Sequence, residues 1–562
     1  MFLFKKISRG KEYWYIGENK KVNGKSVRVF EVYIGTIETI LALKQNEIPL
    51  AQIKESIVFE FGISAAMMHL MDQLSFREII NDIVPSPNKT GADSGTLVSL
   101  LVINHCIDSL SKHSLTNWYT KSFLHRYLGV KPKQLSSQRI FDLMKKITPE
   151  HITQITNNLV KRSQTLYDIQ FDCLLYDPTN FTTYIQPHPG RPSTLPQWGK
   201  PKDGKRKLLQ INLALIVTKE DGIPIFHQVY QGNDNDPTEF KIVVQELIKH
   251  SQYFVGTSDF VTLIFDKGNN SSNAFEYLNN SPYHFIGSLR PSTQTDLFEL
   301  PTDTFEEEWI SSRKHKTKAH RLKRVIYGVE RTVIVTWYEP SAKKSSKTLE
   351  THLKKAEIKL IELQSKLNQP KYTKQAQIEK KIKRVVNKKS IRGLFNYQVV
   401  EEKQDNGTIL IKIIWSRNET AINLAKNSFG RNILFTNQES WTTEEIVKAY
   451  RSQWRIERNF RELKDPEGIK ADPLRHWIDE TIQVHYFLCV LALFFKRLLH
   501  REVHHAGLNW SLEETIKTLD SIKEVFILEF GTDAIHRTLT QLSSEEKVIY
   551  DLFKLDSYHL SQ

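Results

Sequence analysis

The amino-acid sequence predicts a mixed α/β domain that is interrupted by an α+β insertion, with a helical region before it and another after it. Three observations predict this fold class. Branched apolar runs alternate with helical segments between residues 168 and 290, apolar residues recur at helical spacing on either side, and a lysine-rich stretch interrupts the series. A chain of 562 residues is too long for one core, so we expect about three or four domains.

Composition excludes several classes of protein. The hydrophobic fraction of 40% and the charged fraction of 25% are typical of a soluble globular protein. The three cysteines, Cys106, Cys173 and Cys489, are widely spaced and form no C-x-x-C pair, which indicates a reducing compartment and no structural zinc. The N-terminus lacks a signal-peptide core, and the longest apolar stretch, 484–495, is too short to span a bilayer. We therefore expect a cytoplasmic protein without a membrane partner.

The charge of the chain points to a polyanion as its partner. The formal net charge is +14 and the pI is near 9.3. Most of this excess lies in one segment, because residues 343–392 contain sixteen Lys or Arg against four Glu, a local excess of +12.

The N-terminal third divides into a β and a helical part. Residues 1–37 alternate apolar and polar residues around Asn23-Gly24, which is a strong hairpin signal and predicts a small β element. Residues 38–167 switch to helical spacing, beginning with IETILALKQ, and predict a helical domain. The spacing there indicates bundle packing and identifies no recognition helix.

Residues 168–290 predict the first part of the α/β core. IQFDCLLYD, LLQINLALIV and IPIFHQVYQG indicate three buried strands, and FVTLIFD and YHFIGSL indicate two more with helices between them. The order β-β-β-α-β-α is that of a mixed sheet.

Residues 291–430 are expected to form the insertion. After strand-like segments, the apolar residues Leu349, Leu353, Ala356, Leu360, Leu363 and Leu367 repeat at intervals of four and three. A second helix can return along the first, which predicts a basic helical hairpin over 343–392. The alternative is a solvated coiled-coil spacer. Residues 431–500 resume the core, and 501–562 predict a helical C-terminal region whose histidines, His500, His504 and His505, lack further metal ligands.

The run YRSQWRIERNFRELK, residues 450–464, predicts one continuous helix because it has no Gly or Pro before Pro466. On a helical period Tyr450, Gln453, Glu457 and Lys464 share a face. That face suits a metal or phosphate site. The alternative is a solvated helix in which Glu457 pairs with the arginine four residues later.

Three acids stand out by position. Asp177 follows the first buried strand, Asp266 follows a later one, and Glu457 lies on the helix after the insertion. Carboxylates at strand ends share the edge of a sheet where α/β sites form, and they are ligands that magnesium prefers. A pair of such ions can activate the attacking oxygen and stabilise the leaving oxygen of an in-line displacement.

Each aspartate also has a structural interpretation. Asp177 and Asp266 both begin good turn sequences, DPTN and DKGN. Other acids compete for the role: Asp234 lies near a strand end, Asp236 is explained as a helix cap, and Asp172 falls on the opposite face of its strand. Spacing alone leaves the choice open.

A family resemblance covers roughly residues 60–500. The run at 450–464 resembles the signature Y-x2-R-x3-E-x6-K of bacterial insertion-sequence transposases of the DDE type, and it matches at Tyr450, Glu457 and Lys464. LLYDPTNF, DGIPIFHQVYQGNDND, LIFDKGNNS, RTVIVTWYE, ILFTN and HYFLCVLAL are similar to that family's other motifs, in the same order.

The resemblance implies a ribonuclease H-like core in which Asp177, Asp266 and Glu457 hold two Mg²⁺ ions, with Mn²⁺ as a substitute. Tyr450, Gln453 and Lys464 would bind DNA phosphates. It further implies an endonuclease that cuts at insertion-sequence ends and joins the freed 3′ hydroxyl to target DNA. The helical region 38–167 would bind the ends, and the protein would act as a homodimer on DNA, associated with the bacterial nucleoid.

The sequence departs from the signature at one position. Gln453 stands where the family has arginine, and glutamine can hydrogen-bond a phosphate but cannot neutralise it. Two alternatives therefore stay open: a metal-dependent DNA nuclease without strand transfer, and a catalytically weakened DNA-binding relative.

Overall fold

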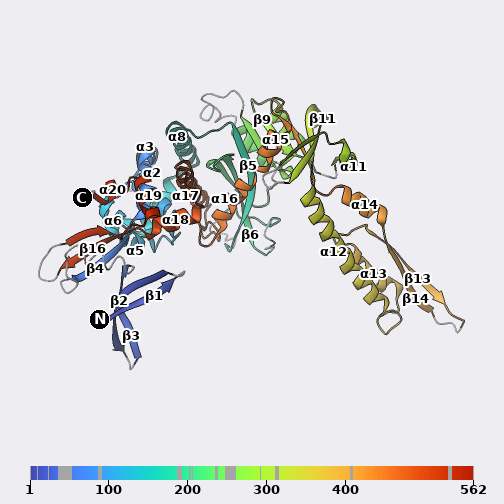
Figure 1. The fold of residues 1–562 in the computed structure, drawn as a ribbon, viewed down its shortest axis with the longest axis horizontal. Coiled ribbons are helices and arrows are strands. Elements are labelled where there is room, and N and C mark those ends of the chain that lie inside the picture. The colour runs from blue at the N-terminus through green and yellow to red at the C-terminus, as the bar shows by residue number, and fades with distance from the viewer. Residues whose placement is uncertain are drawn as a thin grey trace. The chain divides into compact units, whose positions relative to one another are not determined.

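The structure is a computed structural model that describes residues 2–8, 11–22, 25–35, 53–86, 91–185, 193–201, 204, 207–234, 238–246, 261–290, 293–310, 315–405, 409–529 and 535–560 (Figure 1). The chain forms two compact units. The first comprises Met1–Val261 and Ser452–Gln562, and the second comprises Thr262–Arg451.

The first unit begins with three antiparallel strands, β1 (Phe2–Ser8), β2 (Lys11–Val22) and β3 (Lys25–Gly35). Val22 pairs with Lys25, so β2 and β3 are the antiparallel pair that the hairpin signal predicts. The two connecting residues themselves lie outside the described part of the chain.

Helices form most of the next hundred residues. They are α2 (Gly62–Gln73), α3 (Phe76–Ile83), α4 (Ser94–Ile107), α5 (Leu115–Tyr119), α6 (Leu124–Leu128), α7 (Ser137–Lys146) and α8 (Pro149–Tyr167). The helix expected at IETILALKQ lies outside the described residues.

The chain's C-terminal region differs from the expected helical region. It contains α18 (Leu512–Ser521), α19 (Ser544–Leu552) and α20 (Asp556–Leu560), but also β16 (Lys523–Glu529) and β17 (Ile535–Leu539). β16 pairs with β17 and with β4 (Ile53–Glu60), a strand in the region 38–167 that we expected to be helical. Because β4 and β16 are far apart in the sequence, local spacing cannot reveal their pairing.

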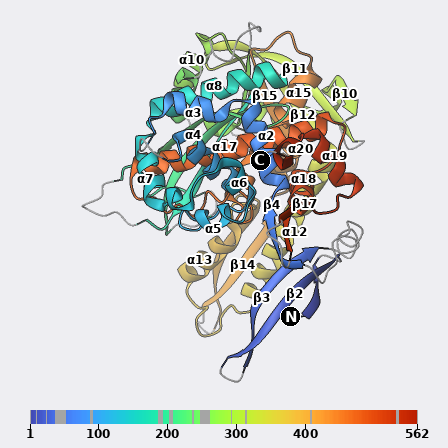
Figure 2. The ribbon, with the colours of Figure 1, turned by 90° about the vertical axis from the view of Figure 1, so that its left-hand side faces the viewer.

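Helix α17 (Asp479–His505) is the central element of the first unit (Figure 2). It packs against α2, α4, α7, α8 and β7. By length and composition alone it could cross a membrane, but 94% of its most apolar window is buried inside the structure. Packing therefore accounts for its apolar sequence.

The first unit also holds three antiparallel strands, β5 (Cys173–Thr183), β6 (Leu209–Thr218) and β7 (Pro224–Gln231). We expected β5 to end at Asp177. The strand instead continues for six more residues, through the DPTN sequence. The reason is that Phe181, Thr182 and Thr183 are buried, and aromatic and β-branched side chains favour an extended backbone.

The second unit contains a mixed sheet with the strand order β10-β11-β12-β15-β9-β8. Strand β8 is parallel to β9 and the other pairs are antiparallel, so the predicted mixed α/β class is confirmed. The strands are β8 (Thr262–Phe265), β9 (His284–Ser288), β10 (Glu307–Ile310), β11 (Lys316–Ile326), β12 (Val329–Tyr338) and β15 (Arg431–Thr436). The accompanying helices are α10 (Ser272–Asn279), α11 (Thr295–Glu299) and α15 (Thr443–Arg451).

The pairing of β12 with β15 places β10, β11 and β12 in this sheet rather than in a separate insertion that starts at 291. The chain leaves the sheet only at Glu339. Residues 339–427, called the basic arm below, then form α12 (Glu339–Gln364), α13 (Gln375–Val386), β13 (Phe395–Lys403), β14 (Ile409–Arg417) and α14 (Glu419–Asn427) (Figure 1).

The basic arm has its own hydrophobic core. The leucine seam of α12 is buried together with Ile378 and Ile382 of α13 and with Val399 and Ile411 of the two strands. Arg417 at the end of β14 binds two acids of α12, Glu350 and Glu357, through four hydrogen bonds of 2.6–3.0 Å. The predicted helical hairpin, α12 with α13, therefore packs against a two-stranded antiparallel sheet, β13 with β14.

Candidate active site

Asp177 and Lys464 belong to elements of the first unit that pack on each other. Asp177 lies in the middle of β5, half-buried, opposite Leu215 of β6. Helix α16 (Trp454–Lys464) packs against β5. Lys464 Nζ donates a hydrogen bond of 2.9 Å to Thr179 Oγ1 and lies 5.0 Å from the centre of the Phe181 ring. The ammonium group is therefore held over the strand that carries Asp177.

Glu457 lies in the first turn of α16, where the helix dipole favours an acid. Its side chain is exposed. Among the residues that the structure describes, no side chain hydrogen-bonds or ion-pairs with its carboxylate, and the predicted alternative pairing with Arg461 is not formed. The solvated salt-bridged helix is therefore not what the structure contains.

The buried face of α16 is fixed by a polar contact in the interior. Asn459 is completely buried, and its Nδ2 donates to the Gly222 carbonyl oxygen at 2.6 Å. Arg497 of α17 donates from Nε to Asn459 Oδ1, also at 2.6 Å. These two bonds attach α16 to the β6–β7 turn and to the central helix, and so determine where Glu457 is presented.

The run 450–464 is not one continuous helix, contrary to our prediction. Helix α15 ends at Arg451 and α16 begins at Trp454, with a turn at Ser452 and Gln453. Each helix buries its own apolar residues. Gln453 is half-buried, and its backbone carbonyl accepts hydrogen bonds from the N–H groups of Ile456 and Glu457. Tyr450 and Glu457 therefore do not share one helix face.

Asp266 and Tyr450 meet within the second unit. Asp266 directly follows β8, and its Oδ1 accepts hydrogen bonds from the Tyr450 hydroxyl at 3.0 Å and from Ser288 Oγ at 2.9 Å. Burial, and then the charge of Asp266, raise the pKa of Tyr450, so the phenol is a neutral donor at physiological pH. The turn predicted after Asp266 is also present, as the short 3-10 helix Lys267–Asn269.

Glu457 in the first unit and Asp266 in the second unit each have carboxylate oxygens of the kind that bind a divalent cation. The Glu457 carboxylate is not neutralised by a described cation, and the second oxygen of Asp266 has no hydrogen bond within the described residues. Carboxylate oxygens are the ligands preferred by Mg²⁺ and Mn²⁺.

Sequence reasoning missed one acid near this region. Glu239 lies in the helical residues 238–246, is only 4% exposed, and its Oε1 has no hydrogen-bond partner within the described residues. Burial, and then the charge of Asp234, raise its pKa to about 7. The next residue, Phe240, packs on Tyr176, the neighbour of Asp177. Asp236, which the sequence suggests as a helix cap, lies outside the described residues.

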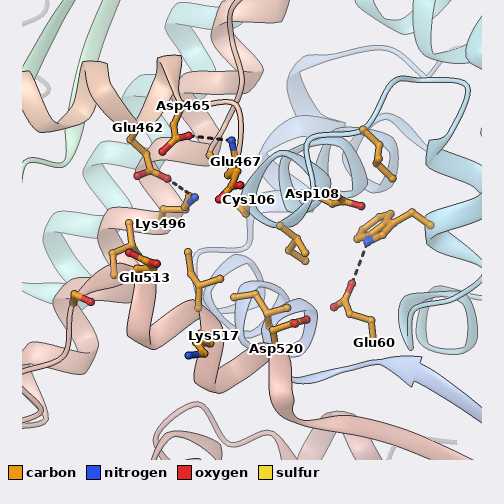
Figure 3. A pocket seen from close by; sticks show the side chains of 18 of the residues that line it. Glu60, Cys106, Asp108, Glu462, Asp465, Glu467, Lys496, Glu513, Lys517 and Asp520 are labelled. Carbon is orange, nitrogen blue, oxygen red and sulfur yellow. Dashed lines mark hydrogen bonds and ion pairs between the residues drawn. The ribbon is translucent and has the colours of Figure 1, made fainter. Parts of the chain in front are cut away.

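A cavity of about 860 Å³ lies elsewhere in the first unit, and Figure 3 shows its lining. It combines acids and cations, of which Glu462 pairs with Lys496 and Glu60 accepts from the Trp118 indole at 3.0 Å. None of the six predicted site residues lines it. The cavity is therefore separate from the candidate site.

The basic arm presents its cations to solvent. Fifteen of the sixteen Lys and Arg side chains between 343 and 392 are exposed, and the other, Lys381, lies 3.5 Å from the centre of the Tyr372 ring. Within the described chain, ion pairs of these cations are limited to Lys343 with Glu339 and Lys383 with Glu379. The remaining cations are available to an external anion.

A comparison of the sequence with models of known protein families places this chain in one family. Residues 170–493, more than half of the chain, match the family model described as a transposase DDE domain. A search of curated proteins found no match. Among solved structures, the chain is similar to the piggyBac transposase in a cryo-EM structure of its synaptic complex with hairpin DNA. The identity is 11% and the TM-score is 0.37, over 81% of this chain and 79% of that chain. The family assignment rests on the sequence match.

Proposed function

Because the chain belongs to the transposase DDE domain family, we propose that it cuts DNA at the ends of a bacterial insertion sequence and joins the freed 3′ hydroxyl to target DNA. Water adds across a phosphodiester bond in the first step and leaves a 3′ hydroxyl. That hydroxyl attacks a target phosphate in the second step and displaces a target 3′ oxygen. The observation that carries the proposal is the family match, whose span includes every predicted site residue.

Asp177, Asp266 and Glu457 are the proposed ligands of two Mg²⁺ ions. Their oxygen chemistry supports this choice, as does the Glu457 carboxylate that no described cation neutralises. When bound, such ions supply charge stabilisation to the attacking and leaving oxygens.

Protein groups would orient the acids and the DNA. Lys464 would hold a phosphate beside the strand that carries Asp177, and its bond to Thr179 supports this position. Tyr450 would orient Asp266 through its hydroxyl, in addition to the phosphate contact that the signature implies. Gln453 would contribute a weaker, uncharged contact.

The finer architecture belongs to the same proposal. The core would be ribonuclease H-like and interrupted by the basic arm, with residues 38–167 binding the ends. The enzyme would act as a homodimer on DNA, in the cytoplasm at the nucleoid. The excess charge of the chain supports a DNA partner.

One assay tests the catalytic proposal. Linear end DNA and a target plasmid are incubated with Mg²⁺ and the full chain, and binding, nicking and joining are scored separately. Asp177→Asn, Asp266→Asn and Glu457→Gln should each lose nicking and keep binding. Asp172→Asn is the matched control, because Asp172 is an exposed acid near the start of the same strand as Asp177.

The outcomes separate the alternatives. Nicking without joining by the wild type would identify a nuclease. Binding without nicking would identify a weakened relative, as Gln453 in place of arginine suggests. A variant that still cuts would remove its residue from the site.

The DNA role of the basic arm is tested through salt dependence. Lys355→Gln with Lys359→Gln neutralises two exposed cations of α12, and we expect the slope of log affinity against log salt to fall by up to about 1.8, or about 0.9 for each lost phosphate contact. The control is Lys517→Gln with Lys547→Gln, two exposed lysines outside the arm. An unchanged slope in the arm variant would support a spacer instead.

A further inference from the structure

Two buried histidines and a cysteine meet in the interior of the first unit, outside the candidate active site. His105 lies on α4, and His485 and Cys489 lie one turn apart on α17. The three side chains are 7%, 8% and 0% exposed. Their candidate ligand atoms all lie within 4.8 Å of one another. That spacing is compatible with a single ion bound between them.

The hydrogen bonds around His105 leave one of its nitrogens available. Ser109 Oγ donates to the Ile469 carbonyl oxygen at 2.5 Å and lies 3.0 Å from His105 Nδ1. Because the hydroxyl proton is already used, Nδ1 must carry the proton and donate to Ser109. The lone pair then resides on Nε2. Metal-binding histidines are commonly oriented in this way by a hydrogen bond at the other nitrogen.

His485 and Cys489 provide the second observation. His485 Nδ1 is buried and has no hydrogen-bond partner within the described residues. Its Nε2 lies 3.8 Å from Cys489 Sγ and 3.4 Å from the Ala471 carbonyl oxygen, which is a weak contact. With its proton on Nε2, facing the Ala471 carbonyl oxygen, His485 presents the lone pair of the buried Nδ1, and a bound ion would satisfy that unpartnered nitrogen.

We propose that His105, His485 and Cys489 bind one divalent ion of the zinc class. Imidazole and thiolate ligands favour zinc over magnesium, so this site and the carboxylate site would take different metals. His476 lies beside this cluster, with its ring centre 5.1 Å from that of His485, and its Nε2 faces the Lys112 ammonium group. The proposal does not rest on the proposed enzymatic function.

The protonation states of the ligands agree with this chemistry. Burial lowers the pKa of His105 to about 4 and the pKa of His485 as well, so both rings are neutral and can donate a lone pair. Burial raises the pKa of the Cys489 thiol to about 12. Binding therefore replaces the thiol proton with the metal and releases that proton to solvent.

The ammonium group of Lys112 lies beside this cluster and would repel a bound metal cation. Lys112 Nζ lies 3.2 Å from His476 Nε2, and burial lowers the pKa of this lysine.

The site would connect segments that are far apart in sequence. Ser109 and His485 also contact the carbonyl groups of Ile469 and Ala471, which follow α16 directly. An ion held here would therefore link α4 and α17 and restrain the segment that leaves α16.

Metal content tests the proposal directly. The full chain is purified without chelators, and zinc per chain is measured by elemental mass spectrometry. We expect one zinc per chain in the wild type, and loss of that zinc in Cys489→Ser and in His485→Gln. Cys173→Ser is the matched control, because Cys173 is also buried in the first unit with a thiol pKa raised to about 12.

A second measurement keeps the test independent of how the variants fold. Wild-type protein stripped of metal is titrated with Co²⁺, and we expect a thiolate-to-cobalt charge-transfer band that saturates at one equivalent. Zn²⁺ titration in two buffers of different ionisation enthalpy should show proton release. Folded wild type that holds no zinc and gives no cobalt band would overturn the proposal, as would a folded Cys489→Ser variant that retains its zinc.

Discussion

Replacing Asn459 should destabilise the first unit more than any exposed change on the same helix. Asn459→Ala removes the donor to the Gly222 carbonyl and the acceptor for Arg497, and both bonds are 2.6 Å long in a fully buried position. It leaves the carbonyl and the guanidinium without these partners.

The magnitude follows from the two bonds. A neutral hydrogen bond contributes about 0.5–1.5 kcal/mol and one to a charged group about 1.5–3 kcal/mol. Arg497 Nη2 already lacks a partner within the described residues, so losing the Nε bond leaves more of a buried cation unsatisfied. We therefore expect the free energy of unfolding to fall by about 3–5 kcal/mol.

Urea denaturation of the full chain measures this loss. Asn459→Asp keeps an acceptor for Arg497 but cannot donate to Gly222, and we expect a smaller loss than for alanine. Arg461→Ala, at an exposed position of α16, is the control and should change stability by less than about 0.5 kcal/mol. A loss below about 1 kcal/mol for Asn459→Ala would refute the anchoring argument.

Three further changes have defined outcomes. Tyr450→Phe should raise the metal concentration needed for half-maximal end cleavage without weakening end binding, because it removes a hydrogen-bond donor to Asp266. Weaker DNA binding with unchanged metal dependence would instead show that Tyr450 contacts a phosphate. Lys464→Met should reduce the salt slope of DNA binding by about 0.9, and an unchanged slope would remove Lys464 from the contacts. Glu239→Gln should raise the melting temperature above that of the wild type, and the difference should grow from about pH 4.5 to pH 7. The reason is that the raised pKa of Glu239 makes the folded wild type lose stability as the pH rises through that window. A difference that does not change with pH would contradict this.

Local spacing was sufficient to predict most strands and helices. Three features could be predicted because they depend on residues close together in the chain: the apolar seam of α12, the pairing of β2 with β3 and the mixed order of strands. The family resemblance supplied the transposase domain, which the match over residues 170–493 then supported. The roles of the individual site residues stay predictions.

Features that depend on burial or on contacts between residues far apart in the sequence could not be predicted. The pairing of β4 with β16 joins residues from opposite ends of the chain. The turn at Ser452 and Gln453 carries neither Gly nor Pro, so nothing local marks it. The DPTN sequence within β5 looks like a turn, yet burial keeps it extended.

The histidine and cysteine cluster of the proposed metal site illustrates the same limit. The expectation of no structural zinc stays a prediction, and it was based on the absence of paired cysteines. His485 and Cys489 share a helix face, which is a visible signal, but the third side chain, His105, comes from a helix 380 positions earlier in the sequence. Only the fold brings the three together.

The length of α12 sets a footprint for the basic arm. Twenty-six residues at about 1.5 Å each make a rod of about 39 Å. One turn of duplex DNA is about 34–36 Å long, and each 1.7 Å of duplex carries about one negative charge. A single arm laid along a duplex would thus cover about eleven base pairs and about 23 phosphates, a window of protection that a nuclease digestion experiment can count.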